Sequence, residues 1–148
     1  MKQSDKIDPV KQDIATFPQI SKEDLKLYTN TVKLINIGNY TAAIKILEDL
    51  CKRFPFNSIF LKTLASCFQN QEKYQAAIIA YRTAHMFMPD SNIDCIYFCG
   101  ICYYKLQRYN EAKIYFKKFI ENKNINEIYK KRALLYFNKI ESLEHNLI

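Results

Sequence analysis

The sequence has 148 residues, of which 49% are hydrophobic and 14% aromatic, enough apolar surface for the core of one compact domain. Only 2 glycines and 4 prolines are present, which argues against a sandwich or barrel of many short strands. The net charge of +7 is spread over every segment. No stretch is apolar enough for a signal peptide or a membrane span, so we expect a protein that inserts into no membrane. The five cysteines are an odd number, which does not suit the disulfide framework of a small secreted domain, so we expect a reducing cytosol.

The chain begins with a polar segment over residues 1–16 that shows no strong periodicity. We expect it to be a flexible N-terminal arm or a means of self-association, with a homodimer as one outcome. The helical pattern starts just after this segment. Ser21 followed by Glu23 and Asp24 resembles a capping box, so the first helix is expected to begin there.

A repeat follows the arm. A shift of 34 residues places 40–44 (YTAAI) onto 74–78 (YQAAI), and Pro55 onto Pro89. A third copy opens at Tyr109, which follows Tyr74 by 35, so one residue has been added in the turn near Asp90. This period is that of the tetratricopeptide repeat, a pair of helices joined by a short turn.

The repeat predicts an all-α fold in which three tetratricopeptide-type hairpins stack as a short right-handed solenoid with a C-terminal capping helix. Expected first helices lie at about 22–36, 58–70 and 93–106, and second helices at about 40–53, 74–87 and 109–122. The repeat domain should span 17–144, with repeats at about 24–57, 58–91 and 93–126 and the cap at about 127–144.

Small residues recur where the second helix of each hairpin crosses the first, at Ala43, Ala77 and Ala112. Ala65 and Gly100 are the matching small residues on two first helices, and small side chains there let backbones approach closely. Asn57 and either Ser91 or Asn92 can cap the helices that follow them. The capping helix has an apolar stripe that should cover the last repeat, formed by Ile128, Ala133, Tyr136, Phe137, Ile140 and Leu143.

The first helices are expected to line a concave groove, because they form the inner curve of such arrays. Its predicted residues sit at the second, fifth, ninth, twelfth and thirteenth places of each repeat. They are Leu25, Tyr28, Val32, Ile35 and Asn36 in repeat one, Ile59, Lys62, Ser66, Gln69 and Asn70 in repeat two, and Asp94, Tyr97, Ile101, Tyr104 and Lys105 in repeat three. Apolar pockets beside amides suit an extended peptide. The alternative is that Val32, Ile35 and Ile101 belong to the core.

Residues that could carry chemistry are few. Cys95, Cys99 and Cys102 have the three-cysteine spacing of radical-SAM iron–sulfur enzymes, but they fall on a repeat helix and are interpreted as buried apolar thiols. His85 and His145 have no neighbours at metal-ligand spacing, and no phosphate loop or nucleophile motif is present. We therefore expect no enzyme, no cofactor and no metal. Both charge signs alternate around the outer helices, so nucleic-acid binding is not expected.

The stretch from about residue 17 to residue 143 resembles the LcrH/SycD/IpgC family, the class II chaperones of type III secretion translocators. The resemblance rests on Leu50-Cys51, on the added residue before repeat three, on Gly100-Ile101-Cys102, and on the single capping helix with Ala133 and Tyr136. It departs from the family where relatives carry aromatics and this chain has Val32 and Ile35.

The resemblance implies a chaperone of the bacterial cytoplasm that holds a membrane-active translocator subunit in its groove, soluble and ready for secretion. Tyr28, Phe60 and Tyr97 match aromatic positions of that family and would anchor the client. The alternative is a scaffold repeat of a secretion or pilus apparatus. A co-chaperone that reads acidic carboxyl termini is disfavoured, because Tyr28 and Val32 replace the Lys and Asn it requires.

Overall fold

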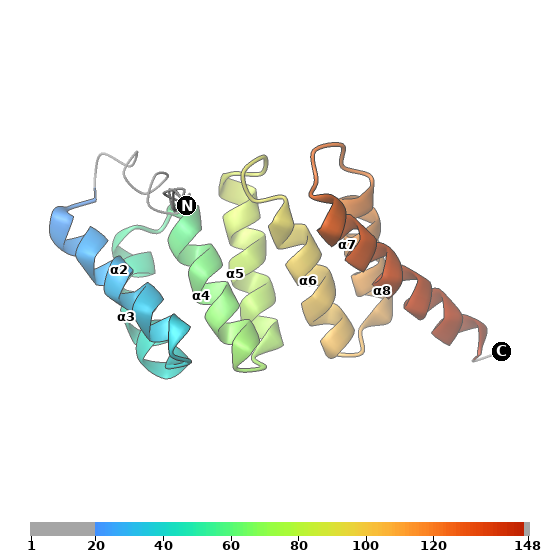
Figure 1. Cartoon of the computed structure of the whole chain (residues 1–148), viewed down its shortest axis with the longest axis horizontal. Helices are drawn as coiled ribbons and strands as arrows, with labels where there is room; N and C mark the ends of the chain where they lie inside the picture. Colours follow the sequence, from blue (N-terminus) through green and yellow to red (C-terminus); the bar gives the residue numbers. More distant parts are fainter. Residues whose placement is uncertain (1–19, 147–148) are drawn as a thin grey trace, which may run out of the picture.

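The computed structural model describes residues 20–146, which form seven α-helices and no strand (Figure 1). Their bounds are Lys22–Asn36 (α2), Tyr40–Arg53 (α3), Ser58–Asn70 (α4), Tyr74–Phe87 (α5), Asp94–Lys105 (α6), Tyr109–Ile120 (α7) and Glu127–His145 (α8). These bounds agree with the expected helices to within two residues. The predicted N-terminal arm lies outside the described residues. No described helix has the length and apolar character needed to cross a membrane.

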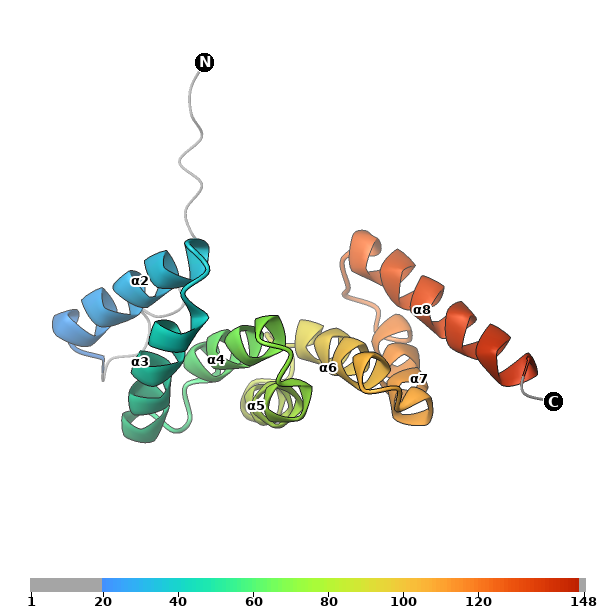
Figure 2. The same ribbon diagram turned by 90° about the horizontal axis from the view of Figure 1, so that it is seen from below.

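The helices pack in chain order, each mainly against the helix before it and the helix after it. Seen from below, α2, α4, α6 and α8 lie on one side of the molecule and α3, α5 and α7 on the other (Figure 2). The row of first helices is curved, since α2 and α8 stand out beyond α4 and α6 at its two ends. The fold is therefore a row of tetratricopeptide-type hairpins closed by a C-terminal helix, and we call the side formed by α2, α4, α6 and α8 the inner face.

Two buried clusters form the core. The N-terminal cluster joins α2, α3 and α4 around Leu47, Leu50 and Phe60. The C-terminal cluster joins the helices from α4 to α8 around Tyr81 and Phe116, among others. Burial of this apolar area supplies the main stabilising term of the fold.

Small residues stand where the sequence predicts close helix crossings. Ala43, Ala77 and Ala112 are fully buried, as is Ala65. The tightest approach is at Gly100, where an added Cβ would lie 2.7 Å from a ring carbon of Phe116. The α6–α7 contact therefore depends on the absence of a side chain at this position.

The turn inside each hairpin has the same backbone in all three repeats. Gly38, Glu72 and Gln107 occupy equivalent places and adopt positive φ values of 79°, 59° and 59°. In each case the next residue's amide returns to a carbonyl of the preceding helix, as in Lys73 N to Phe68 O at 2.9 Å and Arg108 N to Tyr103 O at 2.9 Å. This is the left-handed helix ending that glycine favours, and only the first repeat has glycine there.

Helix caps agree with the sequence at two places and differ at a third. The Ser21 hydroxyl accepts from Asp24 N, and the Asn57 amide oxygen accepts from Phe60 N at 3.1 Å, as predicted. Asn92, by contrast, does not cap α6. Its side-chain nitrogen donates to the carbonyls of Ala84 and Met88, at 3.2 and 3.1 Å, so it closes the end of α5 instead.

The capping helix α8 buries a narrower stripe than predicted. Ala133 and Ile140 are fully buried against α7, but Ile128 is 61% exposed and Leu143 is 40% exposed. The two ends of this long helix extend past the shorter α7, so the outer members of the predicted stripe have no helix to cover (Figure 2).

Candidate peptide-binding groove

The aromatic residues predicted to anchor a peptide lie beneath the inner face. Phe60 is fully buried and packs against Tyr28 with ring centroids 5.2 Å apart. Tyr28 is 4% exposed, and its hydroxyl is hydrogen-bonded to that of Thr63 at 2.9 Å. Tyr28 and Phe60, which the resemblance assigns as client anchors, are therefore buried beneath the face and not exposed on it. The ring of Tyr28, at the fifth place of repeat one, instead fills the space between α2 and α4, the first helices of two adjacent hairpins.

The N-terminal part of the inner face is apolar and partly open. Val32 and Ile35 of α2 pack against the N-terminal cluster and keep part of their surface exposed. Asn36 closes α2 and is exposed. This part of the face is an apolar strip with the exposed side-chain amide of Asn36 at its edge.

The centre of the inner face is polar, but its groups are engaged within the protein. Lys62 of α4 forms an ion pair with Asp94 of α6, bridging two repeats. The Ser66 hydroxyl donates to the Thr63 carbonyl, and the Gln69 side-chain oxygen accepts from the Tyr81 hydroxyl at 2.7 Å. The Asn70 side-chain nitrogen donates to the carbonyl of Ser66. These four predicted groove residues are therefore engaged in bonds within the protein, and Asn70 is the one of the four that is exposed.

The C-terminal part of the inner face is hollowed into a pocket of about 540 Å³ between α6 and α8, which we call the α6–α8 pocket. Tyr97 and Ile101, both predicted groove residues, lie in its wall. Tyr97 is 3% exposed, so its ring forms the floor. Tyr104 stands beside the pocket with its ring 4.9 Å from that of Tyr136, and Lys105 is exposed at the end of α6.

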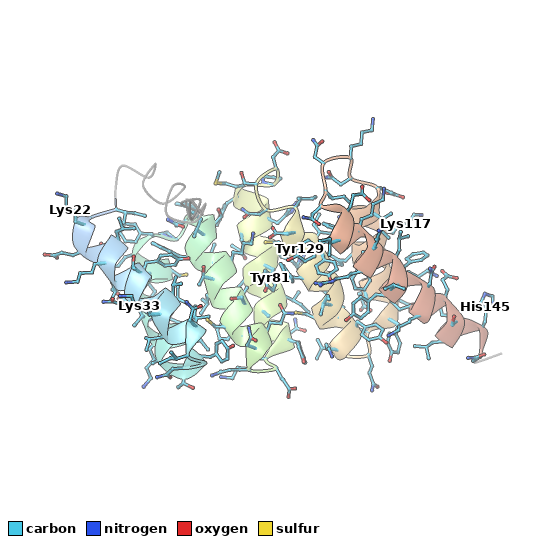
Figure 3. The ribbon with its side chains drawn as sticks, in the orientation of Figure 1. Lys22, Lys33, Tyr81, Lys117, Tyr129 and His145 are labelled. Atoms are coloured by element: carbon cyan, nitrogen blue, oxygen red, sulfur yellow. The ribbon has the colours of Figure 1, made fainter. Side chains whose placement is uncertain are left out.

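Much of this pocket comes from residues that sequence reasoning did not assign to the site. Its other lining residues are Phe98, Tyr129, Arg132, Leu135, Tyr136 and Lys139. Figure 3 shows Tyr129 between α6 and α8, where its ring lies 5.1 Å from that of Tyr97. The spacing of 129, 132, 136 and 139 is that of one helix face, so the sequence contains a signal for this wall of the pocket, although the same helix is predicted from sequence only to cap the last repeat.

The pocket joins aromatic rings to positive charge. The Arg132 guanidinium lies over the Tyr129 ring at 5.7 Å, and the Lys139 ammonium over the Tyr136 ring at 5.9 Å. Burial raises the pKa of Tyr97, as does the nearby Tyr136, while Arg132 lowers it. Neither cation forms an ion pair within residues 20–146.

The three thiols of α6, Cys95, Cys99 and Cys102, are buried beside Tyr81 and not on the inner face. Burial raises the pKa of Cys95 and of Cys102 to about 12 and raises that of Cys99 further. Thiols with such pKa values stay protonated and unreactive at neutral pH. Among the described residues no group of three or more His, Cys, Asp or Glu side chains is placed to hold a metal ion.

Comparison with known proteins supports the repeat. The sequence model of the family described as anaphase-promoting complex, cyclosome, subunit 3 matches residues 36–119, from the last residue of α2 to the end of α7. The chain belongs to this family. A comparison with curated proteins gives no match.

Solved structures share the fold at low sequence identity. The type III secretion chaperone SycD of Yersinia enterocolitica, in complex with a peptide of the translocator YopD, is 22% identical with a TM-score of 0.75, covering 85% of this chain and 98% of that one. PcrH in complex with the chaperone-binding region of PopD is 18% identical with a TM-score of 0.75, covering 85% and 97%. The first TPR of Spaghetti (RPAP3), bound to an HSP90 peptide, is 21% identical with a TM-score of 0.72, covering 85% and 96%.

Proposed function

We propose that this protein is a chaperone of the bacterial cytoplasm that binds an extended segment of a type III secretion translocator along its inner face. The observation that carries the proposal is the inner face itself, which has partly exposed apolar residues at both ends, Val32 and Ile35 on α2 and Ile101 on α6. An extended chain can place side chains into such sites at intervals of about 3.3 Å per residue.

Two further points support it. SycD and PcrH, which are similar over nearly their whole length, are solved with segments of the translocators YopD and PopD. The sequence features that resemble the translocator chaperones, notably Gly100 and the single capping helix, are also those that build the α6–α7–α8 end of the fold.

In this proposal the buried aromatic residues shape and support the binding surface from beneath. Tyr28 and Phe60 support the apolar strip of α2 from below, and Tyr97 forms the floor of the α6–α8 pocket. We therefore assign direct contact to Val32, Ile35, Asn36, Asn70, Ile101, Tyr104 and Lys105. Replacing a supporting ring would alter binding through the shape of the face and would also lower stability.

The alternative function is a scaffold module within a secretion or pilus apparatus. One neighbour of similar fold, RPAP3, binds an HSP90 peptide. Recognition of an acidic carboxyl terminus of that kind is disfavoured here, because Tyr28 is buried and Val32 is apolar at the two places where a Lys and an Asn would be needed. Scaffold and chaperone differ in the partners they retain.

The test is purification with the products of neighbouring genes, followed by calorimetry. A chaperone returns with one apolar, membrane-active client, whereas a scaffold returns with several apparatus proteins. Val32→Ala and Ile101→Ala should each weaken binding of the client segment by about fivefold, as expected when about 1 kcal/mol of contact is lost. Ile79→Ala and Ile114→Ala are matched controls on exposed positions of α5 and α7 and should leave binding unchanged. If the two control variants lose as much affinity for the client segment as Val32→Ala and Ile101→Ala, the binding site does not lie on the inner face.

A further inference from the structure

We infer that the α6–α8 pocket selects a client segment in which a large apolar side chain is flanked by an aspartate or glutamate. This deepens the proposed function and rests on it, since it names the chemistry that one end of the inner face recognises. The occupant is a partner polypeptide in extended form, and the carboxylate is that of an internal side chain.

The first step of the argument is the shape and lining of the pocket. Its wall consists of aromatic and aliphatic surface from two helices, including Phe98, Ile101 and Tyr129. A volume of about 540 Å³ is large enough for an apolar side chain with its neighbouring main chain. Apolar residues that line a concave surface favour an apolar occupant, because its burial removes both surfaces from water.

The second step is the charge at its edge. Arg132 and Lys139 lie two helical turns apart on α8, each above the ring of a neighbouring tyrosine. Resting on a ring holds a cation near the pocket. Arg132 also interacts with the Tyr97 hydroxyl, and the N–H groups of Arg132 and Lys139 that are not used within the protein can donate to a carboxylate. Guanidinium and ammonium groups placed beside an apolar site therefore favour an anion next to the apolar side chain.

The third step is the absence of a competing acid. The carboxylates near the end of α8, Glu141 and Glu144, both pair with Lys113 of α7, and Asp94 of α6 pairs with Lys62. Within the described part of the chain, no ion pair joins Arg132 or Lys139 to an acid. The charge of the pocket is left to be matched by a partner.

The experiment uses the full chain and a phage-displayed library of randomised twelve-residue peptides, which carries side-chain carboxylates and no free carboxyl terminus. The variant is Arg132→Glu with Lys139→Glu, since both residues are exposed. The matched control is Lys45→Glu with Lys52→Glu, which makes the same charge change on exposed positions of α3, on the other side of the molecule (Figure 2). Melting curves verify that all three proteins fold.

We expect the wild type and the control to enrich peptides with an acid beside a Leu, Ile, Phe or Met. The variant should lose that preference and bind the selected peptide, synthesised with an amidated end, about tenfold more weakly. The affinity of the wild type should fall with added salt, and that of the variant should fall less. In the wild type, the same peptide should shift the NMR signal of the Arg132 side chain.

Two results would overturn the inference, and they differ. Enrichment of apolar peptides with no preference for acids, by wild type and variant alike, would refute the charge selection and leave the inner face as a peptide-binding site. Failure of the wild type to enrich any peptide would count against the proposed function itself, and the inference would fall with it.

Discussion

The close approach of α6 and α7 can be tested by adding one methyl group, with Gly100→Ala. The new Cβ would lie 2.7, 2.9 and 3.0 Å from three ring carbons of Phe116, and the first two of these distances are shorter than real Cβ contacts. The Phe116 ring cannot easily move away, because it is fully buried and stacked on Tyr136 at 5.2 Å, with Tyr97 at 6.1 Å. One of these side chains, or the helix spacing, must shift.

The magnitude follows from two opposing effects. Inserting a methylene-sized group into a packed core costs about 1–3 kcal/mol, and the crowding of three rings favours the upper part of that range. Replacing a helical glycine by alanine returns about 1 kcal/mol through helix propensity. We expect the free energy of unfolding to fall by about 1–2 kcal/mol, which lowers Tm by roughly 2–4 °C for each kcal/mol.

The assay is urea unfolding followed by circular dichroism, in two backgrounds. Phe116→Leu removes the ring that clashes, so Gly100→Ala in that background should be neutral or stabilising by up to about 1 kcal/mol. The difference between the two backgrounds measures the contact. If Gly100→Ala stabilises the wild type as it would an exposed helix position, the close approach does not exist as described.

Three other predictions concern turns, caps and ionisation. Gln107→Gly should raise the free energy of unfolding by up to about 1 kcal/mol, because Gln107 adopts a positive φ that glycine accepts more easily. Gly38→Ala should lower the free energy of unfolding by a similar amount for the same reason. Thermal melts in which the two substitutions shift stability in the same direction would contradict this prediction. Asn92→Ala should cost about 1–3 kcal/mol, since the buried side chain donates to two carbonyls at the end of α5; urea unfolding with Ser91→Ala as the exposed control checks it. The α6 thiols have higher pKa values in the folded protein than the value of 9.0 for the unfolded chain, so the unfolded chain releases their protons first as the pH rises. The contribution of these thiols to the free energy of unfolding should therefore be fully present below pH 9 and should decline by about 1.4 kcal/mol per thiol per pH unit towards pH 12. Joint replacement of the three by alanine should flatten this decline, and an unchanged slope between pH 9 and 10.5 would refute the assignment.

The helices were predictable because their signals are local. The 34-residue period, the tyrosine at the start of each second helix and the prolines after the first two of these helices mark helix starts and ends within a few neighbouring residues. The buried state of Ala43, Ala77 and Ala112 followed as well, since a repeat places one residue type at one crossing each time. The caps at Ser21 and Asn57 depend on hydrogen bonds to amides two or three residues away, which the sequence contains.

What the tertiary structure decided is which side of each helix is left uncovered. Tyr28 sits at a position that faces inward in the repeat, and Phe60 matches an aromatic position of the resembling family. Both are nevertheless buried, because the first helices of adjacent hairpins pack together around them. Asn92 bonds to the preceding helix and not to the following one because its side-chain amide reaches two carbonyls at the end of α5. The α6–α8 pocket joins Tyr97 with Arg132 and Lys139, residues 35 and 42 positions apart, and no local pattern reports that distance in space. Helix boundaries are set by short-range bonds, but a binding surface is set by how helices distant in the chain pack, and that required the three-dimensional fold.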